Sequence, residues 1–149
     1  MNIAIKNLQK AVAIDSRVLR AIKKAIRKTW EAEARKYHAG EITICLVNNR
    51  RIRNLNLKYL GQDHPTDVIA FNLAQGTKKS SDPIIADIII STEKAISNSR
   101  IFKTSTLYEL LLYVVHGLLH IFGYGDKNPR QQNIMQDKAE KILKFWKEP

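Results

Sequence analysis

The chain has 149 residues, of which 44% are hydrophobic and 26% charged, which is the size and composition of one globular domain. Its single cysteine, Cys45, excludes an internal disulfide framework and a zinc site built from cysteines, and is typical of a reducing compartment. The sequence has no run of about 18 apolar residues and no secretory leader pattern, so we expect a cytoplasmic protein that does not span a membrane.

Positive charge is concentrated in the first part of the chain. Lys and Arg number 25 against 14 Asp and Glu, a net charge of +11, and residues 1–60 alone carry 14 basic and 4 acidic side chains. Such a field favours a polyanionic partner, most commonly nucleic acid. A solvated basic helix would have the same composition, so charge alone leaves both interpretations open.

Hydrophobic periodicity, helix caps and turn residues predict the elements in chain order. The predicted helices cover residues 15–40, 48–61, 92–99, 104–122 and 128–146, and the predicted strands cover 41–47, 68–73 and 84–90, with a polar loop over 76–82. Helices outnumber strands and do not alternate strictly with them. We therefore expect a single α+β domain over residues 1–149, in which helices cover a small mixed sheet of about four strands.

The predicted helix over 104–122 is apolar on nearly all sides, which places it at the centre of the domain. It carries His116 and His120, whose i, i+4 spacing puts both imidazoles on one face, where they can share a metal ion. Gly123 is expected to end the helix, and Asp126 follows as a potential third ligand. This spacing is that of the metzincin motif H-E-x-x-H-x-x-G-x-x-H, and it predicts a zincin-like metal site.

Two departures from that motif bear on the chemistry. Gly117 stands where the motif has its glutamate general base, which argues against peptidase activity. Asp126 stands in place of the third histidine, and a carboxylate can complete a zinc site that keeps one position open for water. The alternative interpretation makes Asp126 an ordinary turn residue.

Four segments extend this pattern over much of the chain: LNLKYLGQD at 55–63, PTDVIAF at 65–71, ADI at 86–88 and HGLLHIFGYGD at 116–126. In the same order they resemble the motifs L-N-x-x-Y-R-G-x-D, P-T-D-V-L-S-F, G-D-I and H-G-x-L-H-x-x-G-Y-D-H of the YbeY family. The members of this family are bacterial metal-dependent endoribonucleases and rRNA maturation factors. The similarity covers roughly residues 41–146.

The resemblance implies a zinc-dependent endoribonuclease that cuts single-stranded RNA in rRNA processing and ribosome maturation, with rRNA and the small ribosomal subunit as partners. It implies one Zn²⁺ per chain, held by His116, His120 and Asp126, with both histidines also catalytic and water in the fourth position. The fold implied is a single metallohydrolase domain.

The chain departs from the family pattern at two positions. Without gaps, the family's third histidine falls on Asp126; with Gly125 as an insertion, Lys127 would take its place. We prefer Asp126, because a charged lysine does not bind a metal ion. The family's arginine that is thought to contact RNA phosphate corresponds to Leu60, which cannot donate a hydrogen bond. Basic residues of the same predicted helix are candidates to replace it: Arg50, Arg51, Arg53 and Lys58.

Two further carboxylates are candidates to support the site. The resemblance suggests a role for Asp67 near the metal cleft, and an Asx-turn is the alternative. Asp87 interrupts an apolar strand, where it would either orient a ligand imidazole or accept hydrogen bonds from donors in the sheet. Lys78, Lys79 and the basic face of residues 17–36 are candidates for contacts to the RNA backbone.

Two other functions fit the sequence. A non-catalytic RNA- or ribosome-binding maturation factor with a structural metal would agree with Leu60 and Gly117. A metal-dependent peptidase or other hydrolase would agree with the zincin-like spacing but not with Gly117. Metal-dependent cleavage of RNA would separate the first function from both.

Overall fold

The computed structural model describes residues 1–34, 40–74 and 83–148. The strands are β1 (Asn2–Asn7), β2 (Gly40–Val47), β3 (Val68–Asn72) and β4 (Ile84–Ser91). The helices are α1 (Ser16–Glu33), α2 (Asn49–Leu60), α3 (Thr92–Phe102), α4 (Thr106–Ile121) and α5 (Pro129–Ile142), with a 3₁₀ turn η1 (Leu143–Phe145). The expected α+β fold with a small mixed sheet is confirmed. No described helix is long and apolar enough to cross a membrane.

The sheet has the order β1-β2-β4-β3. β1, β2 and β4 run parallel, and β3 pairs antiparallel with β4 at the other edge. β1 was not among the predicted strands, because its only residues packed against the core are Ile3 and Ile5, too few for a clear alternation. Its pairing with β2, from Asn2 opposite Glu41 to Asn7 opposite Leu46, joins segments far apart in sequence.

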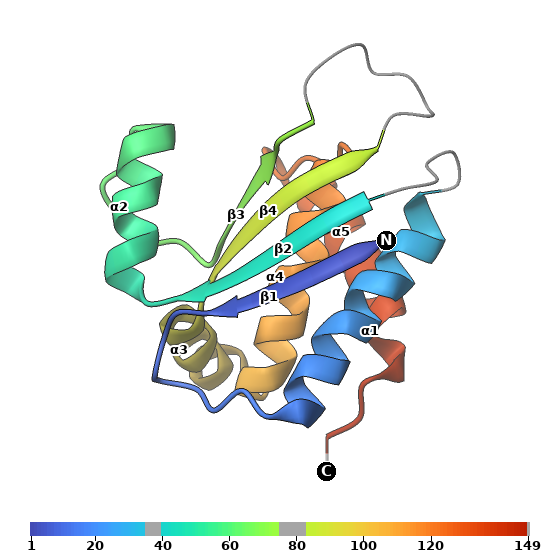
Figure 1. The fold of residues 1–149 in the computed structure, drawn as a ribbon, viewed down its shortest axis with the longest axis horizontal. Coiled ribbons are helices and arrows are strands. Elements are labelled where there is room, and N and C mark those ends of the chain that lie inside the picture. Colours follow the sequence, from blue (N-terminus) through green and yellow to red (C-terminus); the bar gives the residue numbers. More distant parts are fainter. Residues whose placement is uncertain (35–39, 75–82, 149) are drawn as a thin grey trace.

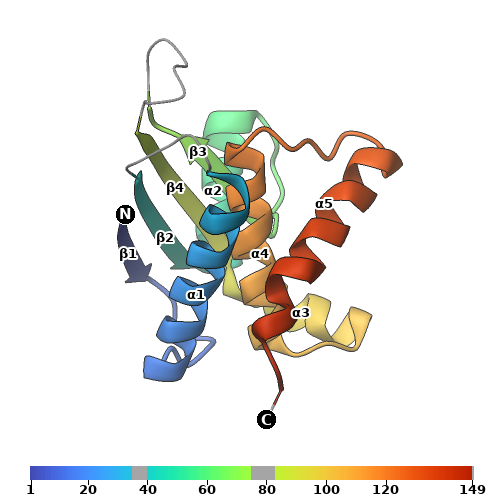
Figure 2. The ribbon, with the colours of Figure 1, turned by 90° about the vertical axis from the view of Figure 1, so that its right-hand side faces the viewer.

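The two faces of the sheet carry different layers. α1 and α4 lie along one face, with α5 beyond α4 and α3 near the end of α4, whereas α2 lies on the other side (Figures 1 and 2). Ala86, Ile88 and Ile90 of β4 belong to the main core with α1 and α4, and Ile89 belongs to a smaller core with Ile52 of α2. α4 is therefore enclosed between the sheet and other helices, as its all-round apolar sequence predicts.

Polar side chains cap the helix starts, which lie within a residue or two of the predicted ones. The side chains of Asp15, Asn48, Ser105 and Asn128 each accept a hydrogen bond from a backbone N–H in the first turn of the helix that follows. The predicted helix ends are less exact. α1 ends at Glu33 rather than Gly40, which begins β2, and α3 continues to Phe102 instead of ending near Ser99. The predicted loop at 76–82 lies outside the described residues.

Gly40 and Gly117 are required by close packing. A Cβ on Gly40 would lie 2.4 Å from Cη2 of Trp30, so the start of β2 passes directly against that ring. A Cβ on Gly117 would lie 2.7 Å from Cγ2 of Ile88 and 3.2 Å from Cγ2 of Val68. The absence of a side chain at Gly117 thus allows α4 to approach β3 and β4 closely.

Replacing Gly117 by alanine is expected to lower the free energy of unfolding by about 1 kcal/mol, and by at most about 2 kcal/mol. Overpacking of a core typically costs about 1–3 kcal/mol, and the better helix propensity of alanine offsets only about 1 kcal/mol of this. Chemical denaturation monitored by circular dichroism measures the change. The matched control is Gly125→Ala, whose Cβ would meet the flexible end of the Gln131 side chain. Equal stability of the two variants would contradict the packing role of Gly117.

Candidate functional site

A pocket of about 470 Å³ opens beside α4, between the start of β3 and the first turns of α5. Its lining includes all three predicted metal ligands and Asp67; the complete set is Thr66, Asp67, Val68, His116, His120, Asp126, Gln132, Asn133, Met135 and Gln136. The fold thus gathers residues from four separate segments around the two histidines.

His116, which lines this pocket, has a buried nitrogen, Nε2, without a hydrogen-bond partner among the described residues. Burial lowers the pKa of His116, and the Asp67 carboxylate only partly opposes this effect. The imidazole is therefore held neutral, with a ring nitrogen unsatisfied. A neutral imidazole nitrogen is the form that binds a metal ion.

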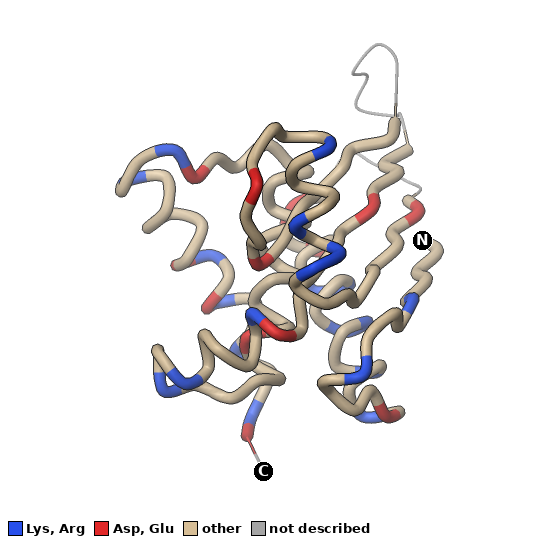
Figure 3. The backbone as a smooth tube through the Cα atoms, turned by 90° about the vertical axis from the view of Figure 1, so that its left-hand side faces the viewer, with Lys and Arg blue, Asp and Glu red and all other residues tan. Residues whose placement is uncertain are grey.

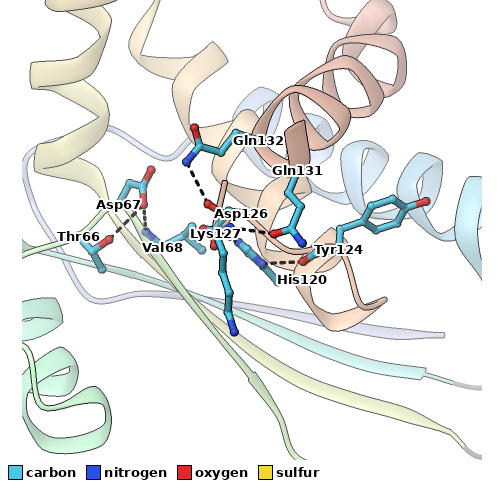
Figure 4. Close-up of polar contacts among 9 residues, drawn as sticks. All are labelled: Thr66, Asp67, Val68, His120, Tyr124, Asp126, Lys127, Gln131 and Gln132. Atoms are coloured by element: carbon cyan, nitrogen blue, oxygen red, sulfur yellow. Dashed lines mark hydrogen bonds and ion pairs between the residues drawn. The ribbon is translucent and has the colours of Figure 1, made fainter. Parts of the chain in front are cut away.

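His120 is oriented by the turn that follows α4. Its Nδ1 lies 3.0 Å from the backbone oxygen of Tyr124, and because a carbonyl oxygen only accepts, Nδ1 carries the proton (Figure 4). The Nε2 atom then presents its lone pair, and it lies 3.5 Å from Oδ2 of Asp126. The side chain of Asp126 is 61% exposed, so its carboxylate has room to change rotamer.

The Tyr124 turn is itself held by two residues that sequence reasoning missed. The hydroxyl of Tyr124 donates to the carboxylate of Glu33, with oxygen–oxygen distances of 3.0 and 3.2 Å. Nζ of Lys138 donates to the same carboxylate at 3.0 Å. Hydrogen bonds to Tyr124 and Glu33 raise the pKa of Lys138. Glu33 is 91 residues from Tyr124 in sequence, so no local signal identifies the pair.

Asp67 lies beside the histidines, and its side chain accepts a hydrogen bond from the residue directly after it rather than from the second residue on, as an Asx-turn would. Its Oδ1 accepts from the backbone N–H of Val68 at 2.8 Å and from the hydroxyl of Thr66 at 3.3 Å, which fixes the entry to β3 (Figure 4). The residue also lines the histidine pocket. Its negative charge acts on His116 by raising the pKa of that imidazole.

Gly117 explains the missing glutamate of the metzincin pattern. Its Cα faces Ile88 and Val68 of the sheet rather than the pocket. A glutamate there would be forced into the core between α4 and the sheet. The zincin-like spacing of the histidines is therefore not accompanied by a general base at the next position.

Asp87 does not reach the histidines, so its predicted role in orienting a ligand imidazole is wrong. Its neighbours Ala86 and Ile88 face α4, and because side chains alternate along a strand, Asp87 faces the other side of the sheet. There it lies near Cys45. The pKa of the Cys45 thiol is raised, chiefly by burial and secondly by the negative charge of Asp87.

The basic residues of α2 also lie apart from the pocket. None of Arg50, Arg51, Arg53 and Lys58 lines it, and Nε of Arg53 donates to Asp63 at 2.7 Å. Seen from the α2 side, both signs of charge are spread over this face (Figure 3). Leu60, at the end of α2, is 56% exposed and free of the core. Lys78 and Lys79 lie outside the described residues.

The side chains of His116, His120 and Asp126 are of the types that bind a divalent metal, although they are not arranged as a complete metal site. As placed, no three His, Cys, Asp or Glu side chains of the described segments are close enough together to bind a metal ion. The buried, partnerless Nε2 of His116, the free Nε2 of His120 and the adjacent carboxylate of Asp126 are nevertheless ligands that zinc accepts.

Comparison with known proteins identifies the family of the chain. The family model of Endoribonuclease YbeY matches residues 4–147. A protein of Carboxydothermus hydrogenoformans named Endoribonuclease YbeY is 37% identical over 139 residues, 93% of each chain. One of Syntrophus aciditrophicus with the same name is 36% identical over 147 residues, covering 96% of this chain and 88% of the relative.

A solved structure resembles the fold. The solution structure of TM1509 from Thermotoga maritima superposes with a TM-score of 0.62 at 27% identity, and the match covers 97% of this chain and 91% of that one. The match to the family model extends over nearly the same length, from β1 to beyond α5. From the near-complete match of sequence and fold, we conclude that the chain belongs to the YbeY family of endoribonucleases.

Proposed function

We propose that this protein is a zinc-dependent endoribonuclease that cuts single-stranded RNA in the cytoplasm during rRNA maturation, with the small ribosomal subunit as its partner. Membership of the endoribonuclease YbeY family supports RNA as the substrate. The observation that carries the metal assignment is the buried Nε2 of His116, which has no hydrogen-bond partner within the described residues and lines one pocket with His120 and Asp126. A polar atom left unsatisfied in this way is costly unless a ligand completes it.

His116, His120 and Asp126 would hold the ion. Zinc is a borderline metal that accepts imidazole and carboxylate together, and three protein ligands leave a position for water. When bound, such an ion supplies a Lewis acid for a phosphoryl oxygen and lowers the pKa of its water. The carbonyl of Tyr124, secured through Glu33, keeps the proton of His120 on Nδ1. The chain thereby prepares the Nε2 atom that faces the pocket.

The remaining lining would bind the RNA backbone through neutral donors. The described lining contains no lysine or arginine, so phosphate oxygens there meet the amides of Gln132, Asn133 and Gln136. Contacts of this kind position a strand without selecting its sequence. Long-range attraction would come from the net charge of +11, and the affinity for RNA is then expected to fall with salt.

A second candidate function is favoured by one observation. Leu60 exposes an apolar side chain where the family pattern has an arginine, and the pocket offers no cationic side chain within the described residues to replace it. A maturation factor that binds RNA or the ribosome without cutting, and whose metal is structural, would not need that arginine. The experiment below separates this candidate from the nuclease.

Cleavage of a 5′-labelled single-stranded oligoribonucleotide tests the nuclease directly. We expect the zinc-loaded protein to cut it, and both chelation and His116→Ala to abolish the products, with circular dichroism verifying that the variant is folded. Cutting by the variant at the wild-type rate would contradict the assignment and point to a contaminating nuclease. A folded, zinc-loaded protein that binds the RNA without cutting it would favour the maturation factor.

Metal content distinguishes the two candidates for the third ligand. Asp126→Ala is expected to lower the zinc bound per chain, because its carboxylate lies beside Nε2 of His120. Lys127→Ala is expected to leave it unchanged, since the described contact of Lys127 is a backbone N–H donated to Gln131. Inductively coupled plasma mass spectrometry after dialysis measures both. Loss of zinc only in the lysine variant would overturn the assignment of Asp126.

An arginine at position 60 should strengthen RNA binding. Leu60→Arg is expected to raise the affinity for a single-stranded oligoribonucleotide roughly two- to fivefold and to steepen its salt dependence by about one phosphate contact. The matched control is Leu57→Arg, which adds the same charge on the same helix at a side chain of similar exposure, 49% against 56%. Fluorescence anisotropy over a salt series measures both. Equal gains in the two variants would show a general effect of charge rather than a specific contact of residue 60.

A further inference from the structure

A second pocket, of about 500 Å³, adjoins the histidine pocket between α3, α4 and α5. The two pockets share Asp67, His116 and Gln136, so they are adjacent, with these three residues between them. The second pocket continues along α4 toward its N-terminus, past Tyr113 to Glu109. An RNA strand whose phosphate lies at the histidines therefore has a neighbouring nucleotide within reach of this space.

The lining of the second pocket differs in kind from that of the first. It contains three aromatic side chains, of which Phe102 is 63% exposed at the end of α3, Tyr108 is half-buried and Tyr113 is buried. Exposed aromatic rings beside a single-strand site are the usual platforms on which bases stack. Ile101, the residue before Phe102, is 68% exposed and is not part of the lining.

The charges in this pocket disfavour a phosphate, because no bound metal ion is proposed here to offset the carboxylates. Asp67, Glu109 and Glu140 line it, and none of the described lining residues is a lysine or arginine. Glu109 is only 3% exposed and forms no ion pair among the described residues; it accepts hydrogen bonds from the hydroxyls of Thr104, at 2.8 Å, and Tyr113, at 3.5 Å. Its position in the first turn of α4 stabilises the negative charge.

Hydrogen-bonding groups are already ordered around this carboxylate. The amide nitrogen of Asn98 donates to the hydroxyl of Tyr113 at 2.8 Å, which leaves the amide oxygen of Asn98 as an acceptor. Acceptors near aromatic rings suit the edge of a heterocycle that carries N–H donors. The exocyclic amino group of adenine is such a donor.

We propose that this second pocket binds the base of the nucleotide next to the scissile phosphate. The base would stack on Phe102 and Tyr108 and donate hydrogen bonds to acceptors of the pocket, the amide oxygen of Asn98 and the carboxylate of Glu109. The proposal depends on the proposed function, because it takes a single RNA strand as the occupant of the histidine pocket. It makes Phe102 a residue that selects for unstacked, single-stranded RNA. A base held in a duplex cannot turn its face to the ring.

Binding in the absence of cleavage tests the subsite. The probe is 5′-fluorescein decaadenylate, titrated into the chelated full-length protein and followed by anisotropy. Phe102→Ala is expected to weaken binding by about tenfold, as loss of one stacked base does. The matched control Ile101→Ala removes an equally exposed apolar side chain from the adjacent position and is expected to change the affinity less than twofold. Equal effects of the two variants would overturn the proposal.

A second measurement identifies the occupant. Adenosine 5′-monophosphate is expected to shift the ring resonances of Phe102 and Tyr108 and the side-chain amide of Asn98 in NMR spectra. Shifts of these signals on addition of Mg²⁺ but not of the nucleotide would show a cation site and overturn the proposal. If the nucleotide shifts these ring resonances but the protein never cuts RNA, the subsite stands and the nuclease is rejected. If the protein cuts RNA and Phe102→Ala changes neither the affinity nor the KM, the nuclease stands and the subsite is rejected.

Discussion

The close approach of α4 to the sheet is the constraint on which the site depends. Gly117 packs its Cα against Ile88 and Val68, and a helix turns about 100° per residue, so seating Gly117 on the sheet determines where the residues on either side of it point. His116 and His120 are thereby directed past the edge of the sheet, toward the start of β3 and toward α5. The helix that supplies the largest part of the core is also the helix that presents the chemistry.

This arrangement explains why a zincin-like spacing occurs here without the zincin base. A glutamate after the first histidine requires open space at that position, and in this chain the position is in contact with the sheet. The histidine spacing and the glycine after it suit the proposed metal site, while the absence of the glutamate argues against peptidase chemistry. Membership of an endoribonuclease family is consistent with a site that lacks the glutamate of the peptidases.

Long-range contacts orient His120, one of the proposed metal ligands. His120 depends on the carbonyl of Tyr124, and the ring of Tyr124 is held by Glu33 from α1 and, through Glu33, by Lys138 from α5. Residues that orient a metal ligand typically affect metal affinity nearly as much as the ligands do. Residues of α1, α4 and α5 thus together orient Nε2 of His120. The adjacent acidic pocket lies along α4 toward the N-terminus of that helix.

Local sequence features determined the class of fold, the helix starts and the identity of the central helix. Each has a local physical cause: capping side chains at Asp15, Asn48, Ser105 and Asn128, and an apolar surface all round residues 106–121. The i, i+4 spacing of His116 and His120 likewise follows from helix geometry, and the structure places them in one pocket with Asp126.

Only the tertiary structure decided which side chains face these histidines. Asp67 and Asp87 were both candidates in the sequence. Asp87 lies within β4, where the alternation of side chains turns it away from α4, whereas Asp67 precedes β3 and lines the histidine pocket. The pairing of β1, the contact of Glu33 with Tyr124 and the separation of the α2 cations from the pocket are decided in the same way. These contacts join segments far apart in the chain, and their partners are set by how the layers pack rather than by the residues next to them.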